Sequence, residues 1–99
     1  MDEIVFEIID KTNRKIRLTK RQWSHITVKH PDLTGKEEEI KQALEKPDKI
    51  TQHKFDENMG NYHKYNKNEK VYLLIAVKYL NGKGFIVTSF YTQQLKKNG

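Results

Sequence analysis

The feature that most limits the fold is a pair of strand-like runs joined by a tight turn near the C-terminus. Residues 70–80, KVYLLIAVKYL, and residues 85–92, FIVTSFYT, are rich in the β-branched and aromatic side chains that favour strands. Residues 81–84, NGKG, lie between them, and Asn-Gly favours the positive φ angles of a two-residue hairpin turn. We therefore expect an antiparallel hairpin, with residues 70–80 at the centre of a sheet.

The rest of the chain adds further strands and two helices. Two capping-box patterns each predict a helix: Thr19 with Gln22 for residues 20–29, and Thr34 with Glu37 for residues 35–45. Alternating segments bounded by turn residues predict further strands at residues 4–9, 14–18, 49–55 and 61–67. The predicted fold class is α+β, in the order β-β-α-α-β-β-β-β, with two helices from the N-terminal half packed on one face of an antiparallel sheet.

The length of 99 residues fits one domain, residues 1–99, and the polar tail at about 94–99 is expected to be frayed. The absence of cysteine excludes disulfides and thiolate zinc sites. No apolar run is long enough to span a membrane, and the N-terminus resembles neither a signal peptide nor a transit peptide. We expect a cytoplasmic protein without a membrane partner; delivery into the cytoplasm of another cell by a dedicated secretion system stays open.

The charge of the chain points to a polyanionic partner. Its formal net charge is +6, and Lys and Arg side chains bind phosphates with release of counterions. Nucleic acid is the partner that this charge favours. The alternative is a lysine-rich surface that only keeps the protein in solution.

The two faces of the predicted strand 70–80 differ in chemistry. One set of alternate residues is wholly apolar and is expected to lie under the helices: Val71, Leu73, Ile75, Val77 and Tyr79. The other set contains a small Ala next to a Lys on the same face: Tyr72, Leu74, Ala76, Lys78 and Leu80. That face is half-polar and shallow, so it is either a ligand-binding surface or an ordinary solvated face.

Two histidines of the first predicted helix are candidates for acid–base chemistry. On a helical wheel, His25 and His30 do not share a face, which argues against a zinc pair. His25 lies among the cations Arg21 and Lys29, which lower a histidine pKa and suit a general base. His30 lies at the helix C-terminus, where the dipole favours the protonated form of an acid or phosphate ligand. The alternatives are a solvated His25 and a His30 that caps or packs before Pro31.

The later strands add further candidates. Thr88 is either a plain β-former or a hydroxyl that donates to a phosphate oxygen. Tyr62, Lys64 and Tyr65 interleave aromatic and basic side chains, a pattern typical of base stacking with phosphate contact. The alternative is an edge strand protected by lysine. With Arg21 and Lys29, they form the predicted RNA-binding set, and the predicted binding face carries Lys64 and Lys78.

Five motifs in order carry a resemblance to a known family: W-x-H-I-x-x-x-H-P, L-E-K-P-D-K-I, Y-H-K-Y, Y-L-L-I-A-V-K-Y and G-F-I-V-T-S-F-Y. Over residues 14–96 the chain resembles the phage-associated barnase–EndoU–colicin–RelE-like nuclease domains. The resemblance implies helices packed on a four-stranded antiparallel sheet. It also implies a metal-independent ribonuclease, often a toxin.

By the same resemblance, four residues match the family's site: His25, His30, Lys78 and Thr88. The chain departs from the family where Ser89 stands at a common Ala and Phe90 stands at the Tyr position. RNA supplies its own nucleophile, the 2′-OH, so a base, an acid and cations for the phosphorane suffice. We expect His25 as base, His30 as acid or phosphate ligand, and Lys78 with Thr88 as stabilising groups. No metal and no cofactor is expected, and the product is a 2′,3′-cyclic phosphate.

The rival function is a non-catalytic basic module that binds RNA or a protein partner on the same scaffold. An antitoxin or immunity protein would bind the same basic surface. A metal-dependent DNA nuclease fits less well, because it would need carboxylates clustered on strands, whereas most acidic residues lie in turns and in the KEEE run at 36–39.

Overall fold

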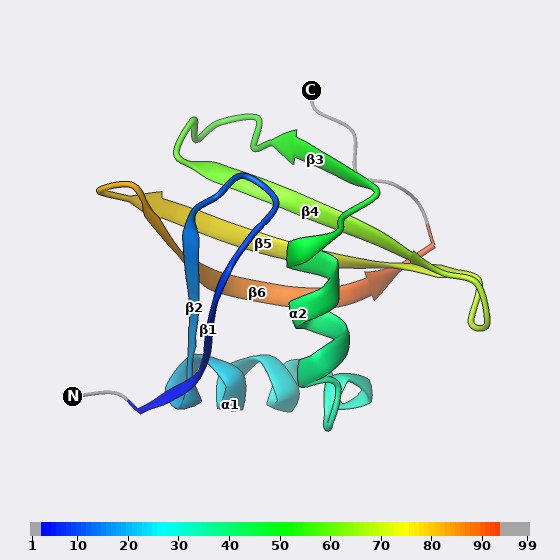
Figure 1. Ribbon diagram of the computed structural model, residues 1–99. Helices are drawn as coiled ribbons and strands as arrows, with labels where there is room; N and C mark the ends of the chain where they lie inside the picture. The colour runs from blue at the N-terminus through cyan, green and yellow to red at the C-terminus, as the bar shows by residue number, and fades with distance from the viewer. Residues whose placement is uncertain (1–2, 94–99) are drawn as a thin grey trace.

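A computed structural model describes residues 3–93, and within them the chain forms a mixed six-stranded sheet with two α-helices (Figure 1). The α+β class is therefore confirmed. The elements in chain order are β1 (Ile4–Ile9), β2 (Lys15–Thr19), α1 (Lys20–Lys29), the 3₁₀ helix η1 (Pro31–Leu33), α2 (Glu37–Glu45), β3 (Lys49–Gln52), β4 (Met59–Asn66), β5 (Val71–Leu80) and β6 (Lys83–Thr92). The tail at 94–99, predicted to be frayed, lies outside the described residues.

The strands lie in the order β1-β2-β6-β5-β4-β3. Neighbours pair antiparallel except for β2 and β6, which pair in parallel through Ile16 with Gly84 and Arg17 with Phe85. The prediction of a purely antiparallel sheet is wrong at this junction. Both helices and three strands connect β2 to β6, and so long a connection permits a parallel pair. Figure 1 shows the β1–β2 ribbon running steeply across the long strands.

The predicted hairpin at the C-terminal end is confirmed. Asn81 and Gly82 have φ angles of 55° and 78°, the conformation that a tight turn between right-handed twisted strands requires. In β5, Leu73, Ile75 and Val77 belong to the hydrophobic core cluster, so the apolar set of alternate residues faces the core as expected. Leu74 and Ala76 of the other set are also buried, with 3% and 7% exposure, so the middle of that face is less open than expected.

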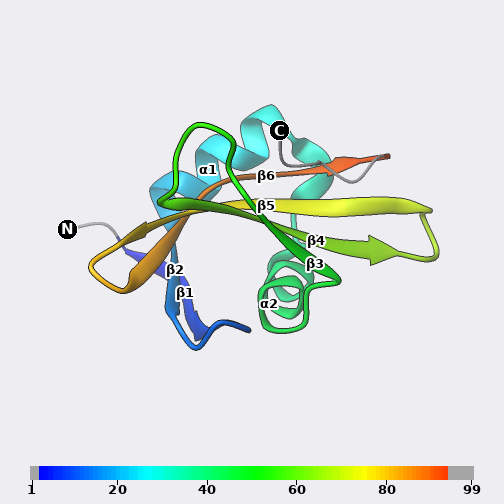
Figure 2. The same ribbon diagram turned by 90° about the horizontal axis from the view of Figure 1, so that it is seen from above.

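Both helices contribute side chains to this core. Ile26 of α1 joins Ile40 and Leu44 of α2 in the same buried cluster as the apolar side of β5. Figure 2 shows α2 on one side of the long strands, whereas the β3–β4 loop arches over the other side. We call the side away from α2 the outer face.

The first helix begins as its sequence indicates. The Thr19 hydroxyl accepts a hydrogen bond from the backbone N–H of Gln22 at 3.1 Å, which satisfies one of the free donors of the first turn. The Gln22 side chain does not return to the cap, however. Its amide donates instead to the carbonyl oxygen of Val87 in β6, which holds α1 beside that strand.

The second capping box is wrong. Thr34 ends η1, and its backbone N–H donates to Pro31 O at 3.1 Å. Gly35 then turns the chain with a φ angle of 81°, and α2 begins at Glu37 after Lys36, which makes no side-chain cap. This turn separates the Thr34 hydroxyl from the first turn of the helix that it was expected to cap.

A β-bulge interrupts the pairing of β5 with β6. Val77 pairs with Ile86, but the preceding residue of β5, Ala76, pairs with Thr88, so Val87 is an extra residue in β6. A bulge changes which side of the sheet the following residues face. Ile86 and Ser89 are therefore both buried on the core side, although they are an odd number of residues apart.

A buried polar cluster fixes the β1–β2 turn to the sheet. The hydroxyl of Tyr62 donates to the Asp10 carboxylate and lies 2.8 Å from the Tyr79 hydroxyl. The guanidinium of Arg14 lies 4.1 Å from the centre of the Tyr79 ring. Burial, followed by the hydrogen bond to Asp10, raises the pKa of Tyr62 far above its usual range, so the hydroxyl stays protonated as a donor.

Candidate functional site

The outer face carries a hollow of about 380 Å³, the candidate site. It is lined from four segments: the β3–β4 region (Gln52, His53, Lys54, Phe55), β4 (Met59, Asn61), β5 (Leu74, Ala76) and β6 (Val87, Thr88, Phe90). Sheet faces left open beside a loop are common places for ligands, because the strands hold the side chains rigidly.

The register of three strands builds the floor of the hollow. Asn61, Ala76 and Thr88 are directly opposite one another on β4, β5 and β6. Ala76 is the small central member, so a ligand can come close to the backbone between an amide and a hydroxyl. The Thr88 hydroxyl is half-buried at this position, where it can donate to an oxygen of a bound group.

The β3–β4 loop forms one wall. His53 lies there because β3 ends at Gln52, three residues earlier than the predicted strand end. Its Nδ1 accepts a hydrogen bond from the Phe55 N–H at 3.1 Å, so the neutral ring carries its proton on Nε2. The Phe55 ring is 83% exposed, and the Lys54 ammonium lies 5.3 Å from its centre. These three residues were missed by sequence reasoning, although H-K-F shows the same aromatic and basic mixture as residues 61–65.

The first helix forms the opposite border. Gln22 contacts Val87, and the His30 ring lies 5.5 Å from the Phe90 ring. Residues 22–30 of the helix therefore run beside residues 87–90 of β6, and Thr88 lies between the two contacts. His30 is half-buried against Phe90, whereas His25 is exposed on α1.

The predicted catalytic residues do not form one hydrogen-bonded group. Within residues 3–93, neither His25 nor His30 makes a side-chain hydrogen bond or ion pair with Lys78 or Thr88. Catalytic hydrogen bonds are often long before substrate binds, so roles in catalysis stay predictions.

Lys78 lies on the outer face but is already paired. Its ammonium forms an ion pair with Asp56. The hydrogen bond that Lys78 donates within this pair, together with one from the Asn58 N–H, lowers the pKa of the Asp56 carboxyl. The pair fastens the β3–β4 loop to β5. Lys78 is two residues from Ala76, about 7 Å along the strand.

The prediction that Lys64 and Lys78 share one face is wrong. Met59 is opposite Lys78, and Lys64 is opposite Leu73 on the core side. The Lys64 ammonium donates to Lys46 O at 2.8 Å, at the end of α2. Lys64 is therefore directed away from the hollow by the register of β4 on β5.

The prediction that Tyr62 stacks on bases is also wrong, because its side chain has 0% exposure inside the polar cluster. Tyr65 does lie on the outer face, 40% exposed, with its ring centre 5.0 Å from that of Tyr72. Arg21 and Lys29 are exposed on α1. Tyr65, Arg21 and Lys29 thus remain candidates for contact with RNA.

Residues 3–93 contain no group of three His, Cys, Asp or Glu side chains placed to hold a metal ion. In the same part of the chain, no helix has the length and hydropathy needed to cross a membrane. Comparison of the chain with protein-family models, curated proteins and solved structures finds no match.

Proposed function

We propose that the chain is a metal-independent ribonuclease that binds RNA on the outer face and cleaves it by 2′-OH attack on the adjacent phosphate. One observation carries the proposal. Helix α1 is held along β6 by Gln22 and His30, so the segment with both helix histidines flanks the segment with Thr88, next to an open hollow. The net charge of +6 favours a polyanionic substrate.

The proposed roles follow from exposure and bonding capacity. The exposed His25 accepts the proton of the 2′-OH, and His30 gives a proton to the leaving 5′-oxygen. The Thr88 hydroxyl donates to a non-bridging oxygen of the phosphorane. Lys78 adds positive charge once it leaves Asp56. The products are a 2′,3′-cyclic phosphate and a free 5′-hydroxyl.

The finer architecture and the biology belong to the same proposal. We propose the barnase–EndoU–RelE-like arrangement from the sequence motifs, and the antiparallel pairing of β3, β4, β5 and β6 supports this proposal. A toxin of that kind is neutralised by an antitoxin or immunity protein, and we propose that this partner would cover the outer face.

The test is incubation of the purified protein with total RNA in excess chelator, read on a gel, with the new ends assayed for cyclic phosphate. His25→Ala and Thr88→Val should each slow cleavage by about 100-fold or more. Lys64→Ala, a lysine change on the other face, is the matched control and should cleave normally. If the protein binds RNA but never cleaves it, the ribonuclease proposal is wrong and the non-catalytic binding module is favoured. If all variants cleave equally, the activity comes from a contaminating nuclease and the proposed roles are wrong.

A further inference from the structure

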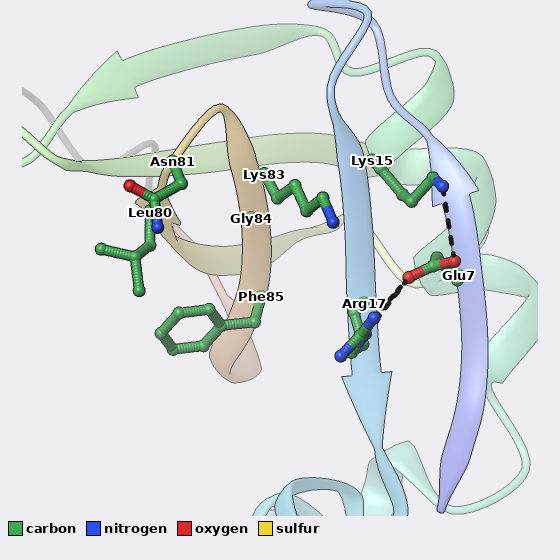
Figure 3. Close-up of a pocket in the computed structure, with 8 residues that line it drawn as sticks. All are labelled: Glu7, Lys15, Arg17, Leu80, Asn81, Lys83, Gly84 and Phe85. Carbon is green, nitrogen blue, oxygen red and sulfur yellow. Dashed lines mark hydrogen bonds and ion pairs between the residues drawn. The ribbon is translucent and has the colours of Figure 1, made fainter.

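A second hollow, of about 280 Å³, lies between the β1–β2 ribbon and the end of the β5–β6 hairpin (Figure 3). We call it the cationic hollow. Its lining residues come from three strand regions: Glu7, Lys15, Arg17, Leu80, Asn81, Lys83, Gly84 and Phe85. The parallel junction of β2 with β6 brings these segments together, since Arg17 is opposite Phe85.

Three cations and one carboxylate line this hollow, a local excess of two positive charges. Glu7 accepts hydrogen bonds from Arg17 at 3.0 and 3.1 Å and lies 3.9 Å from Lys15. This contact holds the Arg17 guanidinium in place. Lys83 forms no ion pair with any residue in 3–93, and Figure 3 shows its side chain extending toward β2.

Apolar side chains lie beside these charges. Leu80 is 61% exposed and Phe85 is 42% exposed, and both belong to the lining. An exposed ring next to cations accepts a nucleic-acid base on its face and the flanking phosphates on the cations. An acidic peptide would use the cations but would leave the ring without a planar partner.

The cationic hollow and the candidate site lie on the same face of the sheet, although they share no lining residue. Phe85 is opposite Lys78, and Thr88 is opposite Ala76, so both side chains project from the outer face of the same two strands. Their partners are two residues apart on β5, about 7 Å. A single strand that passes over Thr88 along β6 therefore arrives at Phe85 and then at Lys83.

We propose that the cationic hollow binds the RNA strand beyond the cleaved linkage, with one base on Phe85 and Leu80 and phosphates on Lys83 and Arg17. This assignment rests on the proposed RNA-binding function. It predicts that the hollow strengthens binding of longer single strands and contributes nothing to a dinucleotide.

The test measures binding of a labelled, uncleavable 2′-O-methyl RNA of about ten nucleotides, over a series of salt concentrations and in chelator. Phe85→Ala should weaken binding about tenfold, as loss of one stacked base does. Lys83→Ala should reduce the slope of log affinity against log salt by about 0.7, which corresponds to one phosphate on a single strand. Lys67→Ala, an exposed lysine in the turn at the other end of β5, is the matched control.

Cleavage of a dinucleotide tests the proposed ribonuclease activity without the cationic hollow, so failure of one proposal can be told from failure of the other. Cleavage of a dinucleotide should be the same in wild type, Phe85→Ala and Lys83→Ala. Unchanged affinity of both variants for the longer RNA would overturn the assignment, even if the enzyme cleaves. Binding of polyglutamate that competes with the RNA and is lost in both variants would also overturn it, in favour of an acidic protein. Because Lys83 is exposed, its variant is informative even if Phe85→Ala folds poorly.

Discussion

Replacement of Tyr62 by Phe should destabilise the fold by about 2 kcal/mol, because it removes a buried hydroxyl that donates to a carboxylate. Tyr62 has 0% exposure, and its hydroxyl contacts both Asp10 and Tyr79. The Asp10 carboxylate keeps its bonds from the N–H groups of Thr12 and Arg14 but loses its link to the sheet. Hydrogen bonds to charged groups contribute about 1.5–3 kcal/mol, which sets the expected size.

The assay is urea unfolding, with thermal unfolding in parallel. In a domain of this length, 2 kcal/mol corresponds to a fall of roughly 8–16 °C in Tm. Tyr65→Phe is the control, since that tyrosine is 40% exposed, and it should change stability by less than about 0.5 kcal/mol. RNA affinity below the Tm should be equal in wild type and Tyr62→Phe. A Tyr62→Phe protein of full stability, or one that is stable but binds RNA weakly, would refute the structural role given to this residue.

Three further outcomes are expected. Thr19→Ala should lower stability by about 1 kcal/mol in urea, whereas Thr34→Ala, which caps no helix, should change nothing; equal losses would contradict the cap assignment. Burial lowers the pKa of His63, so the unfolded chain binds a proton on this side chain more readily than the folded chain does, and stability should fall as pH drops below about 6.5. The urea midpoint of His63→Gln should depend less on pH than that of the wild type. If the two proteins show the same dependence of the midpoint on pH, His63 is not the cause. Lys64→Ala should leave the salt dependence of RNA binding unchanged, whereas Lys78→Ala should reduce the slope of log affinity against log salt by about 0.7. Identical slopes in the two variants would contradict the placement of Lys64 and Lys78 on opposite faces of the sheet.

The parts of the fold that depend on neighbouring residues could be predicted from the sequence. The Asn81-Gly82 turn and the alternation of β5 specify a hairpin and its buried side without reference to the rest of the chain. The same holds for the start of α1, where Thr19 precedes its helix directly. In each case the decisive contacts lie within a few residues, so the pattern is visible in a short window.

Features that depend on register between strands could not be predicted. The sequence shows which residues of β4 alternate, but the length and shape of the β4–β5 turn decide that Lys64 meets Leu73 rather than an outer-face residue. The parallel pairing of β2 with β6 also depends on contacts between distant segments. It requires close approach of Ile16 to β6, and Gly84 permits this approach because a Cβ at position 84 would lie 2.6 Å from Ile16 Cδ1.

Tyr62 shows a second limit, because its surroundings come from distant parts of the chain. In sequence it belongs to a polar, aromatic segment that suggests exposure. In the fold it is buried because Asp10, 52 residues away, accepts its hydroxyl hydrogen. Burial of a polar aromatic side chain is tolerated where such a partner exists, and no local pattern reveals the partner.

The bulge at Val87 connects the fold to the proposed site. In a regular strand, Phe85 and Thr88 would face opposite sides, because an odd number of residues separates them. The extra residue brings both onto the outer face, as their pairing with Lys78 and Ala76 shows. The Val87 carbonyl also accepts the Gln22 amide that holds α1, and with it His25, beside the strand. The single inserted residue, Val87, therefore places side chains of the candidate site and of the cationic hollow on one face. It also binds helix α1, which borders the candidate site. Bulges often redirect side chains in this way next to functional sites.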